Sequence, residues 1–273
     1  MPSKDGAPMV GLLTDFGTGD PYVGVMKAVI LGIAPRVPLV DLSHEVPPQD
    51  VRTGAWLLHT AWQFLPTGSI CLCVVDPGVG SDRRGIAFAA AGRIFVGPDN
   101  GLFSYVLDAS AATSAVVLDN PRYHRPHVSA TFHGRDVFAP AAGHLAAGVA
   151  LAALGTAIDP RALVTLDLPR PGPHPEGLLG HVVYVDHFGN LITDFGPEMA
   201  PAVLCSTPLR LRIGALEVTV QAETFAAGPE GVAFALLDSS GHLAIAVHNG
   251  SAAELLSAGL GAGVLAIGVT PRS

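Results

Sequence analysis

Apolar and polar positions in the first half of the chain follow one repeating pattern. Four short apolar runs each end in an acidic residue followed by a turn, at residues 10–15, 37–41, 70–76 and 94–99. Two stretches between these runs, 21–33 and 51–64, are predicted to be helices. Alternation of strand and helix is typical of an α/β sheet. We therefore predict an N-terminal α/β domain of the sandwich type.

The acidic residues that end these runs are Asp15, Asp41, Asp76 and Asp99. Ligands of α/β sheets bind beyond the carboxyl ends of the strands. The four carboxylates are therefore candidates for one shared pocket. Aspartate is also common in turns and at helix N-termini, so each of them equally has a structural interpretation.

The second half of the chain opens with a proline-rich stretch at 167–177, Asp-Leu-Pro-Arg-Pro-Gly-Pro-His-Pro-Glu-Gly. Such a stretch cannot continue a helix or a central strand, and we predict that it links a first domain at 8–166 to a second at 178–271. Alternating runs at 180–186, 209–223 and 232–247 predict strands, the last broken by Asp-Ser-Ser-Gly as in a hairpin. A short helix at 251–258 and an apolar run at 264–269 follow. We predict a small antiparallel β-barrel, or a sandwich, for this domain.

Composition narrows the class of protein. The 273 residues are 49% hydrophobic and only 14% charged, with 32 glycines and 23 prolines, which favours a compact, turn-rich globular fold over a coiled coil or a disordered chain. The net charge of -8 argues against a nucleic-acid partner. A neutral or cationic small ligand fits this balance better.

The chain holds three cysteines, Cys71, Cys73 and Cys205, without a Cys-x-x-Cys motif or a histidine pair at zinc spacing. We therefore expect neither a disulfide framework nor a zinc site. Cys71 and Cys73 are two residues apart in an apolar run, which predicts that both pack on one face of a strand. The first residues, Met-Pro-Ser-Lys-Asp, lack a signal-type apolar region, and no apolar run reaches about 18 residues, so we expect a cytoplasmic protein without a membrane partner.

Several common catalytic signatures are missing from the sequence. It has no GxxxxGK[ST], GxSxG, HExxH or strand-following GxGxxG motif, which weakens kinase, serine hydrolase, zinc protease and ordinary dinucleotide-binding interpretations. The few charged residues are instead concentrated in short polar segments, at 14–20, 76–84, 97–101, 131–136 and 186–190.

Taken in order, these segments resemble the family of S-adenosyl-L-methionine hydroxide adenosyltransferases, relatives of the fluorinase and chlorinase enzymes. The strongest features are Asp-Pro-Gly-Val-Gly with Arg83 seven residues after Asp76, Phe-His-Gly-Arg-Asp holding His133, and the late Asp-Ser-Ser-Gly hairpin. The resemblance extends from about residue 11 to 256. It implies hydrolysis of S-adenosylmethionine to adenosine and methionine, by attack of water or hydroxide at the ribose 5′ carbon. It implies no cofactor, because S-adenosylmethionine is the substrate.

The resemblance assigns catalysis to Asp76, Arg83 and His133. The sulfonium leaves as a neutral thioether and needs no general acid, so the difficulty lies with the nucleophile. Without a metal, the site must hold water in line and stabilise its hydroxide character. A permanent cation and a histidine, oriented by a carboxylate, can do this. Arg84 is an alternative guanidinium for the same role.

Each of the three residues also has a plainer interpretation. Asp76 precedes Pro-Gly and could simply open a turn. Arg83 lies beside Asp82 and could form a surface ion pair. His133 is one of 11 histidines, and a single histidine is more often packed or solvated than catalytic.

The resemblance also implies substrate contacts. Asp15 matches a residue that accepts both ribose hydroxyl protons, with a helix N-cap as the alternative. Asp186 and Asn190 match positions for the methionine amino group and the adenine, with a β-turn as the alternative. Ser239 matches a residue near the methionine carboxylate, and Asp20 is a further candidate at the amino-acid end. Relatives carry an arginine beside that serine, whereas this chain has Ser240, so the carboxylate contact is partly unassigned.

The same residues leave two alternatives to hydrolysis open, and the resemblance also implies an oligomeric state. A halide-using enzyme of the same fold and a non-enzymatic protein that binds S-adenosylmethionine or a nucleoside are the alternatives to hydrolysis. The complete trio favours the hydroxide-using branch. The implied ligands are divided between the two predicted domains, and the resemblance implies a homotrimer with active sites at the subunit interfaces.

Overall fold

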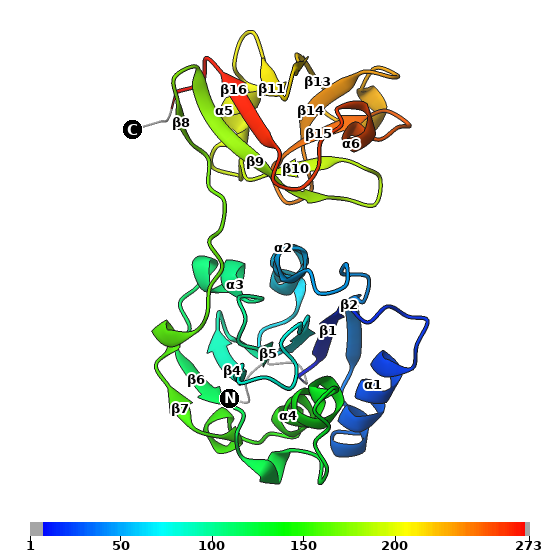
Figure 1. Ribbon diagram of the computed structural model, residues 1–273, viewed down its shortest axis with the longest axis vertical. Coiled ribbons are helices and arrows are strands. Elements are labelled where there is room, and N and C mark those ends of the chain that lie inside the picture. The colour runs from blue at the N-terminus through cyan, green and yellow to red at the C-terminus, as the bar shows by residue number, and fades with distance from the viewer. Residues whose placement is uncertain (1–7, 271–273) are drawn as a thin grey trace, which may run out of the picture. The chain divides into compact units, whose positions relative to one another are not determined.

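The computed structural model describes residues 8–270. Two predictions fall on residues outside this range. They are the lack of a signal region in the first residues and the end of the second domain at residue 271. The chain divides into two compact units, and the boundary along the sequence lies between Asp167 and Leu168 (Figure 1). Each unit is described by itself.

A seven-stranded sheet forms the first unit, in the order β2-β1-β3-β5-β4-β6-β7. Its parallel part comprises β1 (Val10–Thr14), β2 (Leu39–Ser43), β3 (Ile70–Val74) and β5 (Arg93–Pro98). Antiparallel pairings add β4 (Gly85–Ala90), β6 (Ser114–Val117) and β7 (Ala157–Ile158). The predicted α/β class is confirmed, and the four apolar runs of the first half correspond to its four parallel strands.

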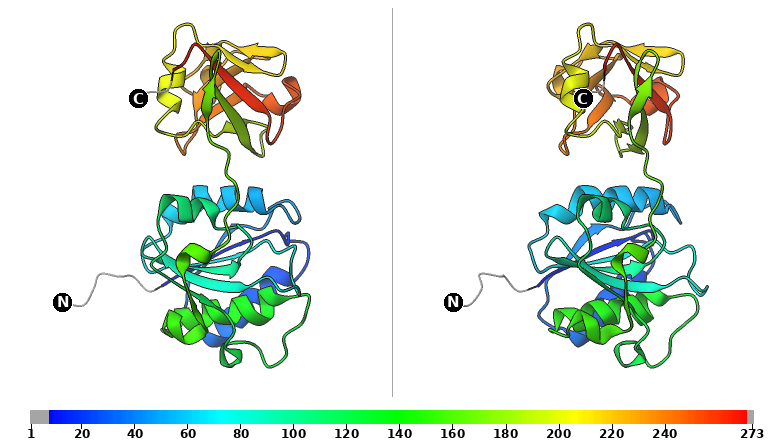
Figure 2. Two further views of the ribbon diagram at one scale, coloured as in Figure 1. Left: turned by 60° about the vertical axis from the view of Figure 1, so that its left-hand side comes forward. Right: turned by 90° about the vertical axis from the view of Figure 1, so that its left-hand side faces the viewer.

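Helices cover both faces of this sheet (Figure 2). The longer ones are α1 (Tyr22–Ile33), α2 (Val51–Ala61), α3 (Ser104–Ala109) and α4 (Ala139–Ala146). A π-helical turn, Gly134–Phe138, leads into α4. Single 3₁₀ turns occupy Trp62–Phe64, Pro121–Tyr123, Leu151–Leu154 and Pro160–Ala162. The two helices predicted at 21–33 and 51–64 correspond to α1 and to α2 with its 3₁₀ extension.

Strand alternation divides the core of this unit into two layers. Leu12 and Leu72, which are partners in the β1–β3 register, pack with Met26 of α1. Cys71 and Cys73 point to the opposite face, as residues two apart on a strand do, and pack in the layer that includes α2 and α3. Both thiols are fully buried and free, and burial raises the pKa of Cys71 to about 12. The prediction that this pair is packed core is confirmed.

Nine strands form the second unit, in the order β12-β11-β16-β9-β10-β15-β14-β13, with β8 beside β9. Their bounds are β8 Gly172–His174, β9 Gly177–Val185, β10 Leu191–Thr193, β11 Leu211–Ile213, β12 Leu216–Val218, β13 Val220–Gln221, β14 Ala233–Leu237, β15 Leu243–Val247 and β16 Gly263–Ile267. Among the described strand pairings of this unit, only β13–β14 is parallel. The terminal strands of this order, β12 and β13, follow one another in the chain, so the sheet curls into a nearly closed barrel, as predicted.

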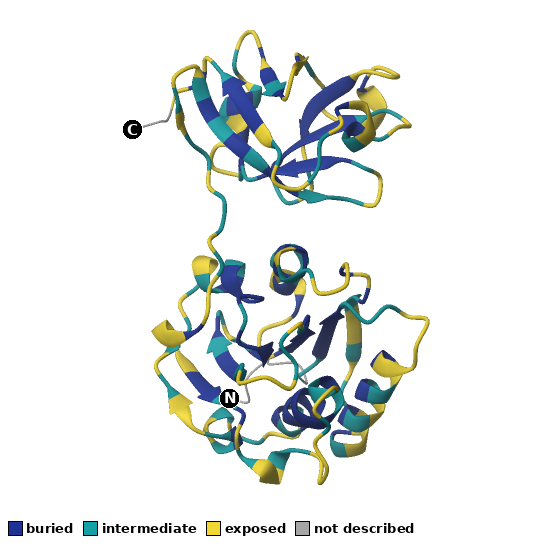
Figure 3. Ribbon diagram, in the orientation of Figure 1, coloured by how far each residue is buried: buried dark blue, intermediate teal, exposed yellow. Residues whose placement is uncertain are grey.

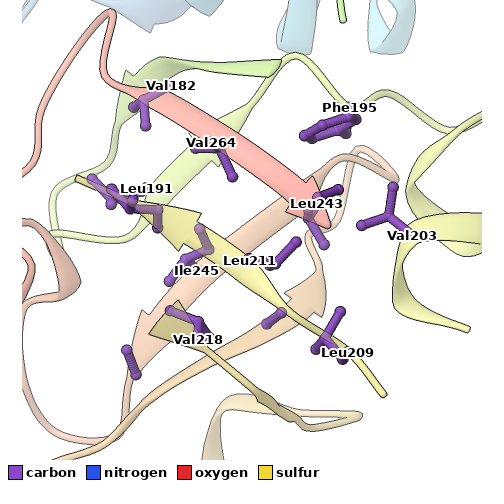
Figure 4. Packing of buried hydrophobic residues seen from close by; sticks show 14 of the residues in the cluster. Val182, Leu191, Phe195, Val203, Leu209, Leu211, Val218, Leu243, Ile245 and Val264 are labelled. Atoms are coloured by element: carbon purple, nitrogen blue, oxygen red, sulfur yellow. The ribbon is translucent and has the colours of Figure 1, made fainter. Parts of the chain in front are cut away.

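Inward side chains of these strands fill the barrel (Figure 4). Leu191, Leu211, Leu243 and Val264 are fully buried there. Two short helices, α5 (Ala200–Leu204) and α6 (Ala252–Leu255), and a 3₁₀ turn at Phe225–Ala227 complete the unit. Buried and partly buried residues alternate along β11 and most of β9, whereas β10, β14, β15 and β16 are mostly continuous runs of buried residues (Figure 3).

Two predicted segments differ in detail from the structure. The run at 209–223, predicted as one strand region, forms three short strands, β11, β12 and β13. Gly172–His174, within the proline-rich segment, form β8, which pairs with β9 on one side only. An edge position accommodates proline because its missing N–H is not needed by a second neighbour. Within residues 8–270, no helix has the length and apolar character that crossing a membrane requires.

Candidate active site

The parallel strands of the first unit bring three of the four predicted carboxylates, Asp15, Asp76 and Asp99, to one edge of the sheet. Thr14 of β1 is the register partner of Val74 of β3, so Asp15 and Asp76 follow the ends of adjacent strands. Asp99 follows β5, which runs parallel to β3, whereas Asp41 lies within β2, opposite Leu12 of β1. The prediction of a strand end is therefore wrong for Asp41, and a ligand pocket shared by the four carboxylates stays a prediction.

Asp76, Arg83 and His133 form one continuous cluster. Arg83 Nε donates to both carboxylate oxygens of Asp76, at 2.8 and 3.0 Å, and Arg83 Nη2 donates to Asp76 Oδ2 as well. The same Nη2 lies 2.8 Å from His133 Nδ1. The Asp76 and Arg83 side chains are only 5% and 11% exposed, and the guanidinium lies 5.2 Å from the ring centre of Phe138. The pair is therefore a shielded, forked ion pair rather than a surface contact with Asp82.

This geometry fixes the protonation state of His133. A guanidinium can only donate hydrogen bonds, so the bond from Arg83 requires an unprotonated Nδ1 and leaves the imidazole proton on Nε2. Burial, and then the charge of Arg83, lower the pKa of His133, while Asp76 and Asp136 oppose this shift. Both considerations favour a neutral imidazole at neutral pH.

A buried carboxylate organises the segment that carries His133. Asp136, in the π-helical turn, is fully buried and accepts hydrogen bonds from Arg135 Nε at 2.7 Å and from the Ser129 amide at 2.9 Å. Burial alone would raise the pKa of Asp136, but the bonds from Arg135 and Ser129 outweigh it, and the pKa is lowered. Sequence analysis did not single out Asp136, because nothing in Phe-His-Gly-Arg-Asp indicates which of its charges is buried.

A close backbone approach joins this segment to the turn after Asp76. Gly80 has a φ of +78°, and a Cβ at this position would lie 2.4 Å from the Ala130 carbonyl oxygen. Only glycine fits such a contact without a shift of the backbone. The loop before His133 and the loop before Arg83 are therefore packed directly against each other.

Arg84 is directed to other partners. Its Nε donates to Asp99 Oδ2 at 2.8 Å, and its Nη2 donates to the Ala162 carbonyl at 2.6 Å. Asp99 also accepts a bond from the Val164 amide at 2.8 Å. Arg84 and Asp99 thus anchor the segment that follows residue 160, and Arg83 is the arginine that contacts His133.

Asp15 is held by the loop between β2 and α2. Its Oδ2 accepts a 2.8 Å hydrogen bond from the amide of Gln49, a residue with a φ of +66°. Helix α1 begins at Tyr22, and the residue at its N-cap is Pro21, so Asp15 does not cap that helix. The N-cap alternative for Asp15 is therefore wrong. Asp20 lies exposed just before α1.

In the second unit, Asp186 and Asn190 build a turn between β9 and β10. Asp186 Oδ1 accepts from the amides of Phe188 and Asn190, both at 2.9 Å, and Asp186 Oδ2 accepts from Asn190 Nδ2 at 2.8 Å. The turn predicted as the alternative is thus present, and the ligand roles of the two residues stay predictions. Phe188, which sequence analysis did not select, is 74% exposed at the tip of this turn.

Ser239 is exposed in the hairpin between β14 and β15. The hairpin is organised by Asp238, which accepts from the Ser240 amide at 2.9 Å and from the His242 amide at 2.8 Å. Ser240 Oγ lies 2.8 Å from both Asp238 oxygens and 3.0 Å from His242 Nδ1. Ser240 therefore serves the turn. Across residues 8–270, no group of three or more histidine, cysteine or acidic side chains could hold a metal ion.

Comparison with protein families defines the class of protein that carries this site. The model of the S-adenosyl-L-methionine (SAM) hydroxide adenosyltransferase N-terminal domain matches residues 10–155, and that of the C-terminal domain of the same family matches residues 180–265. The two matches span most of the chain and one follows the other in the family's order. This protein belongs to the SAM hydroxide adenosyltransferase family, as the sequence motifs predicted.

Individual relatives narrow the comparison. A protein of Salinispora arenicola named (R)-S-adenosyl-L-methionine hydrolase is 43% identical over 256 residues, covering 92% of this chain and 94% of the relative. A fluorinase of Actinoplanes sp. is 29% identical over 276 residues, covering 90% and 92%. The crystal structure of an uncharacterized conserved protein from Thermotoga maritima matches with a TM-score of 0.87 and 34% identity, covering 94% and 98%. The chain thus resembles the hydrolase more than the fluorinase.

Proposed function

We propose that this protein hydrolyses S-adenosyl-L-methionine to adenosine and L-methionine, and that its substrate is the (R) epimer at sulfur. The observation that carries the proposal is the shielded Asp76–Arg83–His133 cluster at the carboxyl edge of the first sheet. The hydrolase relative, with 43% identity over nearly the whole chain, supports the reaction and the epimer.

In the proposed reaction, the oxygen of water or hydroxide bonds to the ribose C5′ as the C5′–S bond breaks. The electron pair of that bond remains on sulfur, and methionine leaves as a neutral thioether. In-line attack depends on holding the nucleophile in place, and we propose the buried, hydrogen-bonded trio for this role. The reaction needs no cofactor, since the sulfonium itself is the activated group.

The contacts within the trio suggest how it acts. Arg83 donates three bonds to Asp76, which has about four acceptor sites, and a further bond to the Nδ1 lone pair of His133. With Nδ1 engaged and Nε2 protonated, His133 has no free lone pair for a proton. We propose that the trio orients the nucleophile and stabilises its developing hydroxide charge, and that the proton passes to solvent water.

For substrate binding, we propose Asp15 as the acceptor for both ribose hydroxyls. Asp186 and Asn190 are proposed for the methionine amino group and the adenine, with Ser239 and Asp20 at the amino-acid end. Phe188, two residues before Asn190 in the same turn, has an exposed ring, and we propose that a base can stack on it. These roles rest on the matched motif positions and on the chemistry of each side chain.

Incubation with a mixture of the two sulfur epimers tests the activity. The (R) epimer should disappear while adenosine and methionine accumulate in equal amounts, and the (S) epimer should remain. Added chloride or fluoride should give no 5′-halo-5′-deoxyadenosine, which the halogenating alternative requires. Recovery of both epimers unchanged after binding would instead favour the non-enzymatic alternative.

We also propose that the protein is a cytoplasmic homotrimer whose active sites draw residues from adjacent chains. The division of the proposed residues over two compact units supports this assembly. Mixing Asp76→Ala chains with Asp186→Ala chains should restore part of the activity that each variant lacks alone. A fully active monomer in light scattering at assay concentration would refute the assembly and leave the chemistry unaffected.

A further inference from the structure

A chain of hydrogen bonds runs from the surface of the first unit to the backbone beside Asp15. Lys27 Nζ lies 2.6 Å from Asp41 Oδ2, and Asp41 Oδ1 lies 2.9 Å from His44 Nε2. His44 Nδ1 lies 2.8 Å from Thr14 Oγ1, which in turn accepts a 3.2 Å bond from the Phe16 amide. The sequence positions of these residues gave no sign that they form one network.

The donor and the acceptor of each bond in this chain follow from the groups at its two ends, Asp41 and the Phe16 amide. Partial burial raises the pKa of Asp41, but the bonds from Lys27 and His44 outweigh it, so the carboxyl is ionised and can only accept. His44 Nε2 therefore carries a proton and donates to Asp41. Thr14 Oγ1 accepts from the Phe16 amide, so its own hydroxyl proton is available to His44 Nδ1, and we take Nδ1 as the acceptor of that bond.

His44 holds the chain on both sides of Asp15. Its ring bonds Thr14, the residue before Asp15, and its carbonyl accepts a 2.8 Å bond from the amide of Gly17, two residues after Asp15. Thr14 is fully buried and His44 is 5% exposed, so the bond between their side chains is shielded from solvent. The same loop supplies the Gln49 amide that bonds the Asp15 carboxylate at 2.8 Å.

We propose that His44 is a positioning residue for ribose recognition, acting through Thr14 and the backbone on either side of Asp15. This inference rests on the proposed role of Asp15 as the ribose ligand. A carboxylate that accepts two hydroxyl protons at once must keep its position within a fraction of an ångström, and the Gln49 amide anchors only one of its oxygens. The buried His44 ring supplies the remaining constraint.

Two substitutions at His44 separate its two ring bonds. His44→Asn would place an amide oxygen near the Nδ1 position and keep the acceptor for Thr14, whereas His44→Gln would keep a donor for Asp41 and lose that acceptor. Thr14→Val removes the hydroxyl with little change of volume. Thr193→Val is the matched control, because Thr193 is also a fully buried residue at the end of a strand. Its hydroxyl donates to the Leu243 carbonyl at 2.8 Å and accepts from the Phe195 amide, two residues further on, at 3.3 Å.

The readout is the ratio of the dissociation constants of 2′,3′-dideoxyadenosine and adenosine, measured by calorimetry on folded protein. His44→Gln and Thr14→Val should reduce this ratio roughly tenfold, the equivalent of one good hydrogen bond, and His44→Asn should recover most of it. His44→Gln and Thr14→Val should also raise KM about tenfold and leave kcat within about twofold, because the ribose contact exists before and during the reaction. Thr193→Val should lower thermal stability without changing the ratio.

Several outcomes would overturn the inference. If the affinity for both nucleosides falls equally in His44→Gln and Thr14→Val, the network only supports the fold. If Asp15→Ala lowers the ratio but these two variants do not, Asp15 binds ribose without His44. If Asp15→Ala leaves the ratio unchanged, both the ribose role and the inference fail. Absence of adenosine formation from SAM, with the expected ratios intact, would instead refute the hydrolase and retain the binding site.

Discussion

Replacement of Arg83 by lysine tests the trio more sharply than its removal. Lysine keeps the positive charge that pairs with Asp76, so the buried carboxylate stays compensated. Its single ammonium nitrogen cannot reproduce a planar fork that donates to Asp76 through Nε and Nη2 and to His133 through Nη2. We therefore expect Arg83→Lys to fold, to retain the ion pair and to lose the contact with His133.

The magnitude follows from the bond that is lost. A hydrogen bond that involves a charged group contributes about 1.5–3 kcal/mol, and each 1.36 kcal/mol of barrier is about tenfold in rate. If the Arg83–His133 bond is fully expressed in the transition state, kcat should fall roughly 10- to 150-fold. KM should change little, because the trio is proposed to act on the nucleophile rather than on the bound substrate.

Arg84→Lys is the control, since Arg84 is the adjacent arginine and also forms an ion pair, with Asp99. It should lower thermal stability and leave kcat within about twofold. Both variants are assayed by chromatography of adenosine released from the (R) epimer, with folding checked by circular dichroism. Near wild-type kcat in folded Arg83→Lys, or an equal loss in Arg84→Lys, would refute the assignment.

Three further predictions concern the same cluster. Asp76→Ala and His133→Ala should each lower kcat at least about a hundredfold, or roughly 2.7 kcal/mol, with a much smaller change in substrate affinity; unchanged rates in folded variants would contradict this. Asp136→Asn should cost about 1.5–3 kcal/mol in chemical denaturation and lower kcat, and wild-type stability would show that Asp136 does not hold the His133 segment. Because its folded pKa is lowered, His133 contributes stability that is present above 6.5, its ordinary value, and lost as pH falls through that lowered pKa. The acid limb of the rate profile should therefore have its midpoint below 6.5, and a midpoint above it would count against a neutral His133.

The sequence was sufficient for the features that depend on local pattern. Apolar runs ending in aspartate predicted the parallel strands. The resemblance carried by Asp-Pro-Gly-Val-Gly and Phe-His-Gly-Arg-Asp selected Asp76, Arg83 and His133, which the structure places in contact, and their catalytic role stays a prediction. The spacing of Cys71 and Cys73 likewise predicted two buried thiols on one face. The strands and the buried thiols could be predicted because the spacing of apolar residues can be read directly from the sequence.

Features that depend on tertiary pairing could not be predicted in the same way. Arg83 and Arg84 are neighbours in sequence, and their partners depend on the tertiary fold. Arg83 bonds Asp76 and His133, whereas Arg84 bonds Asp99. The burial of Asp136 depends on a π-helical turn and on the loop at residue 129, 7 residues away along the chain. His44 contacts Thr14 across 30 residues, a separation at which sequence carries no pairing signal.

Hydrolysis in heavy-oxygen water tests the central claim most directly. The enzyme is incubated with the (R) epimer, and the products are separated and weighed by mass spectrometry. Attack at C5′ predicts one heavy oxygen in adenosine, at the 5′ hydroxyl, and none in methionine. Unlabelled adenosine, label in methionine, or no adenosine at all would contradict direct displacement by water at the ribose carbon.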